Sequence, residues 1–390
     1  MAFGLPTLAI AVLIIYFNCA KKDGATVPPV WKVTASTIEG FLLEIAREKQ
    51  IRFTANELCS FTRNYSKTLG ARGIGTVYEG QLHNGMKIAV VLNRSLAKTA
   101  EKQFMAEVGT IGRTYHRNSV RLYGFCHDQF TNALAYEYME NGSLDKYLFN
   151  DKKEIEWEKL HDIAIGTARG IAYLHEECQH RIIHYDIKPA NILLDSNYLP
   201  KVADFGLAKL CNCDDTHVTL SGYRGTPGYS APEFLLNNHP ITQKCDVYSF
   251  GMVLFEIVGR RRNTNVTPSE SLDWFPKQVW DEFEKNELDA MTVACGIEEK
   301  DREKAIRMSM VALWCVQDSP EARPPMSAVV KMLDGGVEIM PPTKPFNYLY
   351  AIEMNALKPP ETSDGSSNSY WYKDATPIMA KYEIQIATSS

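Results

Sequence analysis

Three short motifs in the middle of the chain constrain its fold more than any other feature of the sequence. They read HYDIKPAN at residues 184–191, DFG at 204–206 and APE at 231–233. Asp186 alone would suit a turn and Asn191 alone would suit the start of a strand, but a chance match to all three motifs in this order is very improbable. The apolar runs at 192–194 and 202–203 are predicted strands that hold the first two motifs rigidly.

The first two motifs match the catalytic loop and the metal-binding segment of protein kinases. Phosphoryl transfer needs little covalent help, so such a site mainly positions the reacting oxygens and neutralises charge. Asp186 would accept the proton of the attacking hydroxyl, and Lys188 would place a positive charge near the transferred group. Asn191 and Asp204 would supply hard oxygen ligands for Mg²⁺, which bridges the phosphates of ATP.

A glycine-rich segment lies far upstream of the catalytic loop. Residues 69–78, LGARGIGTVY, resemble the loop that covers ATP in kinases, where glycines let the backbone approach the phosphates. Arg72 stands where the middle glycine is expected, so this motif is weak by itself and gains weight from its position ahead of the catalytic loop. The residues of this segment that we assign to nucleotide binding are Leu69, Gly70, Gly73, Gly75 and Val77.

Residues 85–92, GMKIAVVL, resemble the kinase strand that carries a nucleotide-contacting lysine two residues after an alanine. Ala89 is that alanine and a candidate nucleotide contact, but Val91 occupies the position of the lysine. The pattern IAVKVL would fit the family, so the sequence IAVVL suggests the deletion of one residue rather than a substitution. Such a loss is either natural or an error in a predicted gene, and both alternatives remain open.

Another cation could take the place of this lysine. Lys87 shares a strand face with Val91, but it lies about 13 Å away at about 3.3 Å per residue, which is beyond its reach. Arg94 has the wrong parity if the strand continues, so Arg72 is the best remaining candidate. On the helix predicted over 100–114, Glu107 is the residue that pairs with the lysine in active kinases, and here we expect it to turn to solvent or to find another cation.

Further segments make the chain resemble plant receptor-like protein kinases of the leaf-rust-resistance type. The resemblance covers about residues 40–340 and is carried by FLLEIA at 41–46, RFT at 52–54, VRLYGFC at 120–126, NGSLDKY at 141–147 and GTPGY at 225–229. It implies an α+β, two-lobed eukaryotic protein kinase fold, with a small β-rich N-lobe that has one main helix and a larger helical C-lobe. It also implies ATP and Mg²⁺ as cofactors.

The resemblance assigns roles to residues outside the three motifs. Tyr136 would be the gatekeeper beside the adenine, and the backbone of the hinge from Glu137 to Met139 would bind it. The pairs Lys188-Pro189 and Thr226-Pro227 are typical of kinases that act on serine and threonine. In the helical lobe, Asp246 would anchor the catalytic loop from below, and Arg323 would form a buried ion pair with Glu233.

Regulation is expected to differ from that of many kinases. Tyr185 stands where those kinases have an arginine that receives a phosphorylated residue of the activation loop. We therefore expect switching to depend less on phosphorylation of that loop. The residues expected to regulate activity are Glu107, Tyr185, Thr219, Ser221 and Thr226.

The chain has room for one catalytic unit with short flanks. We predict a kinase domain over 64–340, divided into an N-lobe at 64–138 and a C-lobe at 139–340, with buried helices at 157–172 and 247–258. Residues 21–63 would be a cytosolic juxtamembrane segment. Residues 341–390 are rich in Pro, Ser, Asn and Thr, which is typical of a disordered tail.

Residues 2–20 carry no charge and are mostly apolar, which is about the length of one membrane-spanning helix. Lys21 and Lys22 follow, so the positive-inside tendency places the rest of the chain in the cytosol, at the plasma membrane. A cleaved signal peptide is the alternative, although it would lack a basic start and a good cleavage site. A truncated gene is another, because receptor kinases of this type have a large ectodomain before this helix, which is absent from this sequence.

The composition of the chain limits the kinds of partner that it can bind. A net charge of −5 and a sequence pI of about 6.0, with no basic stripe, argue against a nucleic-acid partner. Nine cysteines without metal-ligand spacing are typical of reduced cytosolic thiols. The expected partners are protein substrates or a partner receptor kinase.

Two functions of different classes remain. The first is a membrane-anchored serine/threonine kinase that is impaired by the missing lysine, since Asp186, Asn191 and Asp204 are intact. The second is a pseudokinase that binds or regulates a partner kinase, which the loss of the lysine together with Arg72 favours. A sequence error in an ordinary kinase is a third interpretation.

Overall fold

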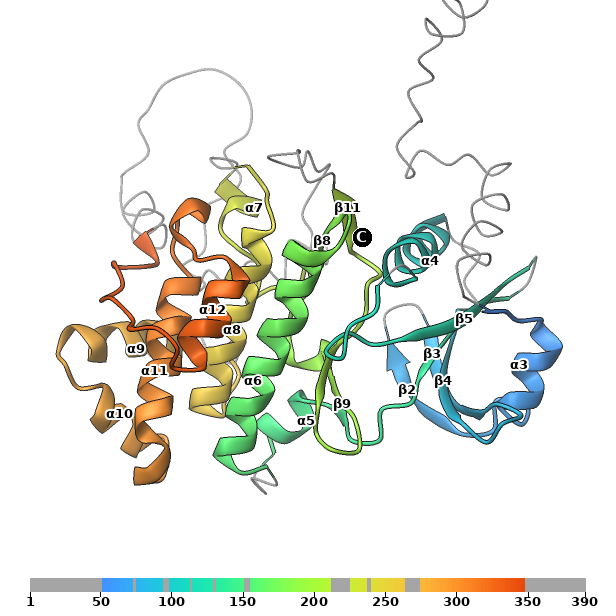
Figure 1. Ribbon diagram of the computed structural model, residues 1–390, viewed down its shortest axis with the longest axis horizontal. Coiled ribbons are helices and arrows are strands. Elements are labelled where there is room, and N and C mark those ends of the chain that lie inside the picture. Colours follow the sequence, from blue (N-terminus) through green and yellow to red (C-terminus); the bar gives the residue numbers. More distant parts are fainter. Residues whose placement is uncertain are drawn as a thin grey trace, which may run out of the picture. The chain divides into compact units, whose positions relative to one another are not determined.

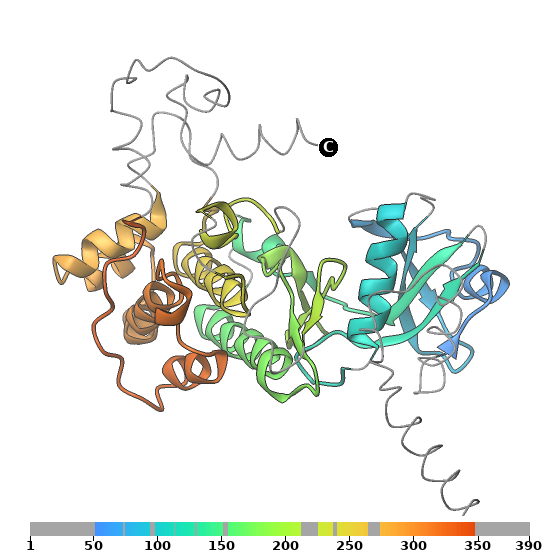
Figure 2. The same ribbon diagram turned by 90° about the horizontal axis from the view of Figure 1, so that it is seen from above.

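The computed structural model of the protein describes residues 51–72, 75–93, 98–112, 114–128, 131–150, 155–211, 225–236, 240–263 and 274–347. They form one lobe built on a β-sheet and a second lobe built mainly of helices (Figures 1 and 2), as the sequence predicts. The predicted membrane span, most of the juxtamembrane segment and residues 348–390 of the tail lie outside these ranges. Within them, no helix is both long enough and apolar enough to cross a bilayer.

The N-lobe contains a six-stranded sheet with the strand order β1-β5-β6-β4-β3-β2. Strand β1 runs parallel to β5, and all other neighbours in the sheet are antiparallel. The strands are β1 (Ile51–Arg52), β2 (Thr68–Arg72), β3 (Gly75–Gln81), β4 (Lys87–Asn93), β5 (Leu122–His127) and β6 (Asn132–Glu137).

A helix that the sequence analysis did not predict packs against this sheet. Helix α3 (Ala55–Phe61) begins at Thr54, whose hydroxyl accepts from the amide of Glu57, while the Glu57 carboxylate accepts from the amide of Thr54 at 2.8 Å. This reciprocal capping box satisfies two amides that a helix start would otherwise leave unpaired. Leu58 is fully buried and joins Val90 of β4 in the core of the lobe, so residues 53–61, which we predicted to be juxtamembrane, are part of the folded N-lobe.

Helix α4 (Lys98–Ile111) is the main helix of the N-lobe and corresponds to the helix predicted over 100–114. It ends earlier than predicted, just before Gly112, a residue that disfavours helix continuation. Phe104, Val108 and Ile111 are buried, as their helical spacing predicts. The ring of Phe104 stacks on His127 of β5 with 5.5 Å between centroids, which fixes the helix to the sheet.

Strand β4 is paired without interruption along its whole length. Val91 lies opposite Val77 of β3 and Leu134 of β6, and the ladder continues to Asn93 with no bulge. Ile88, Val90 and Leu92 face the core of the lobe. The alternate positions of the strand therefore face the space between the two lobes.

The C-lobe is organised around two long helices. Helix α6 (Trp157–Ala172) has the predicted bounds, and α8 (Lys244–Gly259) includes the predicted 247–258. Nearly every side chain of α8 is buried, which is typical of a helix at the centre of a lobe (Figure 1). The remaining helices are α5 (Asp145–Leu148), η1 (Tyr173–Glu177), η2 (Pro189–Asn191), α7 (Glu233–Leu236), α9 (Phe275–Glu284), α10 (Leu288–Ala294), α11 (Glu299–Cys315), η4 (Pro320–Ala322) and α12 (Met326–Leu333).

Short strands of the C-lobe hold the loops that face the N-lobe. Strands β7, β9 and β10 form one small sheet, and β8 pairs with β11. The strand predicted at 192–194 is confirmed, and the one predicted at 202–203 lies slightly earlier. Their bounds are β7 (Gly142–Ser143), β8 (Arg181–Ile183), β9 (Ile192–Leu194), β10 (Pro200–Val202) and β11 (Lys209–Cys211).

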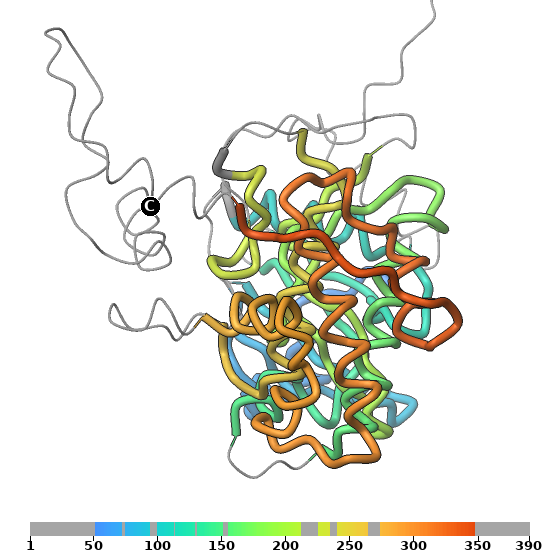
Figure 3. Tube along the Cα trace, turned by 90° about the vertical axis from the view of Figure 1, so that its left-hand side faces the viewer, coloured from blue at the N-terminus to red at the C-terminus, as the bar shows by residue number. Residues whose placement is uncertain are grey.

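The segment after α12 runs across the surface of the C-lobe (Figure 3). Trp314 of α11 donates from its indole nitrogen to the carbonyl of Met340 at 2.8 Å, and Gln317 donates to the carbonyl of Thr343 at 2.8 Å. Asp318 accepts the amides of Phe346 and Asn347. The described part of the predicted tail, 341–347, is therefore bound to the lobe.

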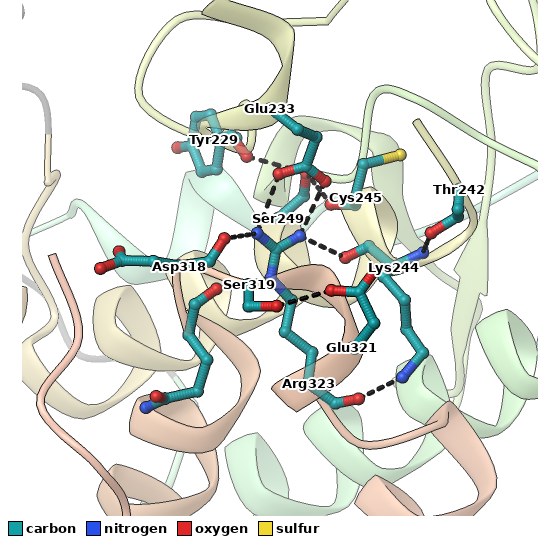
Figure 4. A network of polar contacts seen from close by, with 11 residues as sticks. Tyr229, Glu233, Thr242, Lys244, Cys245, Ser249, Asp318, Ser319, Glu321 and Arg323 are labelled. Carbon is teal, nitrogen blue, oxygen red and sulfur yellow. Dashed lines mark hydrogen bonds and ion pairs between the residues drawn. The ribbon is translucent and has the colours of Figure 1, made fainter. Parts of the chain in front are cut away.

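A buried ion pair links α7 to the segment before α12 (Figure 4). Both terminal nitrogens of Arg323 donate to the carboxylate of Glu233, each at 2.8 Å, and both side chains are 0% exposed. Arg323 also donates to the backbone carbonyls of Gln317, Asp318 and Lys244. The predicted structural ion pair is confirmed.

Candidate active site

A cleft of about 730 Å³ lies between the two lobes. Its lining takes in residues of β2, β3, β4 and α4 on one side and of the catalytic loop and the DFG segment on the other. Gly73 lies outside the described residues, and Asn191 lies behind the lining, next to Asp186. The other residues predicted to bind nucleotide, metal or substrate line the cleft: Leu69, Gly70, Gly75, Val77, Ala89, Glu137, Met139, Asp186, Lys188 and Asp204.

The Asp186 carboxylate accepts hydrogen bonds from Thr226 and Lys188 at the floor of the cleft. The Thr226 hydroxyl donates to its Oδ1 at 2.5 Å, and the Lys188 ammonium donates to its Oδ2 at 2.8 Å. Lys188 also donates to the Thr226 hydroxyl at 2.8 Å, which closes the triangle. Burial acts to raise the pKa of Asp186, but the Lys188 charge and the hydrogen bonds from Lys188 and Thr226 outweigh it, so the pKa lies below its usual value. The carboxylate is thus ionised and oriented at neutral pH.

Asn191 supports Asp186 and keeps an oxygen available. Its side-chain nitrogen donates to the backbone carbonyl of Asp186 at 2.9 Å and to Oδ2 of the same residue at 3.0 Å. Both bonds use the nitrogen, so neither consumes the amide oxygen, which is the atom that ligates metals. Together with the Asp204 carboxylate in the cleft lining, this donor set fits a hard divalent cation.

Asp246 of α8 anchors the catalytic loop from below, as predicted. Its two carboxylate oxygens accept the backbone amides of His184 and Tyr185, each at 2.8 Å. His175 contacts the same carboxylate at 2.9 Å. Tyr185 has a positive φ of 65°, a backbone conformation that costs energy in a residue with a side chain, and these amide bonds stabilise it.

The ring of Tyr185 packs edge to face against Phe234 of α7, with centroids 6.1 Å apart, and the residue is 3% exposed. An apolar contact therefore joins the catalytic loop to the helix that begins at Glu233. The regulatory roles assigned to Tyr185 and Thr226 remain predictions. Thr219 and Ser221 lie outside the described residues.

The DFG segment brings Asp204 near Glu107 of α4. Asp204 has a φ of 70°, and Phe205 is fully buried against the ring of His184, with centroids 4.9 Å apart. A Cβ atom added to Gly206 would lie 3.4 Å from Oδ1 of Asp204 and 3.9 Å from Oε2 of Glu107. Two carboxylates therefore approach the same point in the cleft.

Val91 occupies the roof of the cleft beneath the glycine-rich segment. Ala89, Val91 and Asn93 all line the cleft, which confirms the predicted strand parity. A Cβ atom added to Gly75 would lie 2.9 Å from Cγ1 of Val91, so the valine fills the space under that glycine. Lys87 does not reach this point, because its ammonium lies over the ring of Tyr138, 5.3 Å from the centroid.

Basic side chains are few in the described part of the cleft. Lys146 and Lys188 are the basic residues of the described lining, and Lys188 is bonded to Asp186. The side chain of Arg72 and the whole of Arg94 lie outside the described residues. The prediction that Arg72 replaces the lysine therefore stays untested.

Glu107 is half-buried rather than turned fully to solvent, and its pairing with another cation stays a prediction. It lines the cleft, and the Tyr136 hydroxyl donates a hydrogen bond to its Oε1. The sequence analysis assigned Tyr136 to the gatekeeper position and Glu107 to the helix glutamate that usually pairs with the lysine, but it missed this contact. Two features of the sequence could have indicated the contact: a tyrosine stands at the gatekeeper position, and Val91 replaces the lysine that usually pairs with Glu107.

The side chain of Glu137 has a structural role that the sequence did not indicate. Its Oε1 accepts the amide of Arg121 at 2.7 Å and pairs with the Lys201 ammonium of β10 at 3.0 Å. The backbone amide of Glu137 donates to the carbonyl of Arg121 at 3.0 Å. The hinge is thus fixed to both lobes.

These features define the two-lobed fold of a protein kinase domain, with a cleft that lies between a sheet on one side and the predicted catalytic loop on the other. A family model described as protein tyrosine and serine/threonine kinase matches residues 63–333, and the chain belongs to this family. Kinases of this family use ATP and a divalent metal ion.

Comparison with curated proteins identifies similar plant kinases. The chain is 46% identical over 308 residues to a G-type lectin S-receptor-like serine/threonine-protein kinase of Arabidopsis thaliana, covering 78% of this chain and 37% of the relative. It is 44% identical over 317 residues to rust resistance kinase Lr10 of Triticum aestivum, covering 79% and 49%. The predicted resemblance to leaf-rust resistance kinases is confirmed, and the chain is about equally similar to the G-type lectin kinases. The chain spans less than half the length of either relative.

Proposed function

We propose that the chain is a serine/threonine protein kinase that transfers the γ-phosphoryl group of ATP to protein hydroxyl groups, with Mg²⁺ as the metal and with reduced turnover. The observation that carries this proposal is the triangle of Asp186, Lys188 and Thr226. A catalytic base that is ionised, oriented and paired with a cation is of little use to a protein that only binds a partner. The serine/threonine class also appears in the names of similar proteins.

The residues of the cleft divide the work of the reaction. Asp186 would accept the proton of the attacking hydroxyl through its carboxylate. Lys188 would place its charge beside the group in transfer. A divalent ion held by Asn191 and Asp204 would neutralise the charge of the phosphates.

Reduced turnover follows from Val91. The cleft-facing position two residues after Ala89 carries an apolar side chain, so no cation from β4 reaches the phosphates. Removing one preorganised electrostatic contact typically costs about 10²–10³ in turnover rather than all activity. The intact floor of the cleft therefore supports a slow enzyme.

A pseudokinase scaffold is the alternative, and one observation favours it. Glu107 is engaged by the Tyr136 hydroxyl, so the N-lobe has a stable arrangement that does not need the lysine. A fold adapted in this way can hold a partner without turning over ATP. In that case, restoring a cation at position 91 gains little.

Phosphoryl transfer by the full chain from γ-labelled ATP separates the two functions. The variants are Asp186→Ala, Val91→Lys and, as a matched uncharged control of similar length, Val91→Met. An enzyme shows transfer that disappears in Asp186→Ala and rises about 10²–10³ in Val91→Lys but not in Val91→Met. Equal signals from the wild type and Asp186→Ala, with no gain in Val91→Lys, would establish the scaffold.

We also propose that the chain is anchored in a membrane by residues 2–20 and acts there on protein substrates or on a partner receptor kinase. The uncharged, apolar character of this segment and the lysines that follow it support the proposal. Leu13→Lys together with Ile14→Lys should release the full chain from sedimented membranes. Retention of this variant in the membrane fraction would contradict the anchor.

A further inference from the structure

The chain after α12 binds the C-lobe as a strap of residues 337–347 (Figure 3). Residues 338–346 form neither a helix nor a strand, and three of them are prolines. The strap makes polar contacts with the lobe at every third residue, which is the period of a polyproline II helix. These contacts belong to Val337, Met340, Thr343 and Phe346.

Thr343 differs from the other three contact residues because a side-chain hydroxyl takes part in its contact. The residue is exposed, whereas Pro342, Pro345 and Phe346 beside it are buried. Its hydroxyl donates to Oε1 of Gln317, which follows α11 and is 4% exposed. The strap therefore carries an exposed threonine on an extended segment, and its hydroxyl becomes accessible when the strap opens locally.

The Gln317 amide is fixed with its oxygen toward this hydroxyl. Its Nε2 donates to the carbonyls of Leu313 and Thr343, each at 2.8 Å, so a rotated amide would lose both bonds. The next residue, Asp318, accepts two backbone amides of the strap with its carboxylate. A phosphate on Thr343 would bring a charge of about −2 and oxygens that only accept hydrogen bonds, opposite an amide oxygen and with a carboxylate on the following residue. The docked strap therefore suits threonine and not phosphothreonine.

We propose that Thr343 is a phosphorylation site and that its phosphate, facing the Gln317 oxygen, releases the strap from the C-lobe. A serine/threonine kinase would join the γ-phosphorus of ATP to Oγ1 as the bond from that phosphorus to ADP breaks, and the hydroxyl proton would pass to the catalytic base of that kinase. The strap must leave Gln317 for the transfer, and the phosphate then opposes its return, so modification traps a released state. This proposal goes beyond the proposed function and does not depend on it, because the transferring kinase can be another protein.

Site-specific incorporation of phosphothreonine at position 343 of the full chain tests the release. The reporters are the amides of Phe346 and Asn347, which donate to Asp318 in the docked strap. We expect their hydrogen exchange to be at least about tenfold faster with phosphothreonine than with threonine, because docking loses a hydrogen bond and leaves the Gln317 oxygen without its donor. Thr343→Ser keeps a hydroxyl and should exchange as the wild type does. Exchange that the phosphate leaves unchanged would overturn the proposal.

Gln317→Lys reverses the electrostatic environment of the phosphate. Its ammonium lies opposite position 343 and can pair with the phosphate, so in this background phosphothreonine should slow exchange of the same two amides about threefold or more. Exchange in α6 should not change in any variant, which separates local release from general destabilisation. Faster exchange with the phosphate in the lysine background would overturn the proposal, because the phosphate would then act by its bulk and not against the Gln317 oxygen.

Mass spectrometry of the full chain expressed in plant cells tests whether the site is used. Thr343 is the only serine or threonine between Ser327 and Thr362, so a phosphate on serine or threonine in a fragment within these limits belongs to it. We expect this fragment to carry a phosphate that phosphatase removes and that is lost in Thr343→Val. A chain without phosphate at Thr343 would overturn the proposal.

Discussion

Single residues of the same chemical type have opposite electrostatic environments in this protein. Asp186 faces the cleft beside the Lys188 ammonium, whereas Glu256 of α8 is fully buried inside the C-lobe. Its carboxylate accepts from the Tyr229 hydroxyl at 2.8 Å and from the Asn263 amide at 3.0 Å. Burial outweighs these bonds and raises the pKa of Glu256 to about 7.

Stability should therefore depend on pH through Glu256. Its pKa in the folded chain lies above the ordinary value of 4.5, so the folded state binds more protons between these values, and stability falls as pH rises from about 4.5 through about 7. The difference between the two limits is on the order of 3 kcal/mol. Urea unfolding of the wild type at pH 6 and pH 8 should show the part of this loss that falls between these pH values, about 1.3 kcal/mol, and Glu256→Gln, which cannot ionise, should reduce it. A pH slope in Glu256→Gln equal to that of the wild type would contradict the assignment.

The sequence was informative about residues whose roles depend on short motifs. The functions expected of Asp186 and Asn191 rest on neighbours within a few positions, and the structure places them together. The contact between Tyr136 and Glu107 could not be predicted in the same way, because two segments distant in the sequence meet only after the sheet and α4 have packed. Glu256 was missed because it lies within an otherwise apolar helical run.

At the scale of elements, the register of β4 determines how a lysine restored by substitution and one restored by insertion affect activity and stability. Val91→Lys places the amine on the cleft face and leaves Leu92 in the core. A lysine inserted after Val90 also faces the cleft, but it shifts Val91 into the core position of Leu92. We expect both variants to gain similar activity, whereas the insertion variant should lose on the order of 1 kcal/mol of stability from the smaller core side chain. Thermal unfolding and the transfer assay, measured on both variants, test this prediction. If the two variants were equally stable but differed in activity, the register of β4 described above would be contradicted.

The ion pair of Arg323 and Glu233 is a second element-scale feature. Arg323→Met leaves the Glu233 carboxylate buried without its partner and should lower the free energy of unfolding by about 3–5 kcal/mol. Replacing both residues with methionine removes the stranded charge, so the double variant should be more stable than Arg323→Met. Urea unfolding measures both. A double variant less stable than Arg323→Met would show that the carboxylate has other strong partners.

Elements with a long, regular pattern were predictable, and elements set by local signals were less so. Helix α6 has its predicted bounds because its apolar spacing persists over the whole helix. Helix α3 was missed because it is short and depends on the capping box of Thr54 and Glu57, which outweighs its weak periodicity. Helix α4 ended early because Gly112 interrupts a pattern that continues beyond it.

At the scale of the whole molecule, the two lobes make unequal contributions to the cleft. The C-lobe supplies a catalytic loop fixed by Asp246 and by the contacts of Asp186. The N-lobe supplies a roof in which β4 places the apolar side chain of Val91 where kinases carry a lysine. Carboxylates outnumber basic groups in the described lining, which contains Glu107, Glu137, Glu140, Asp186 and Asp204 beside Lys146 and Lys188.

This charge balance predicts that ATP binding depends strictly on a divalent cation. Electrostatic repulsion between the phosphates and these carboxylates would weaken with Mg²⁺ held at the proposed site of Asn191 and Asp204. Chelation of Mg²⁺ should therefore lower the affinity for ATP at least about 100-fold and leave the affinity for adenosine almost unchanged. Val91→Lys should reduce this dependence to about tenfold, because the ammonium supplies a positive charge that does not need the metal, and Val91→Met should behave as the wild type does. Calorimetric titration of ATP and adenosine, with and without Mg²⁺, measures each value. Affinity for ATP that is equal with and without Mg²⁺ in the wild type would mean that a cation outside the described residues already neutralises this end of the cleft.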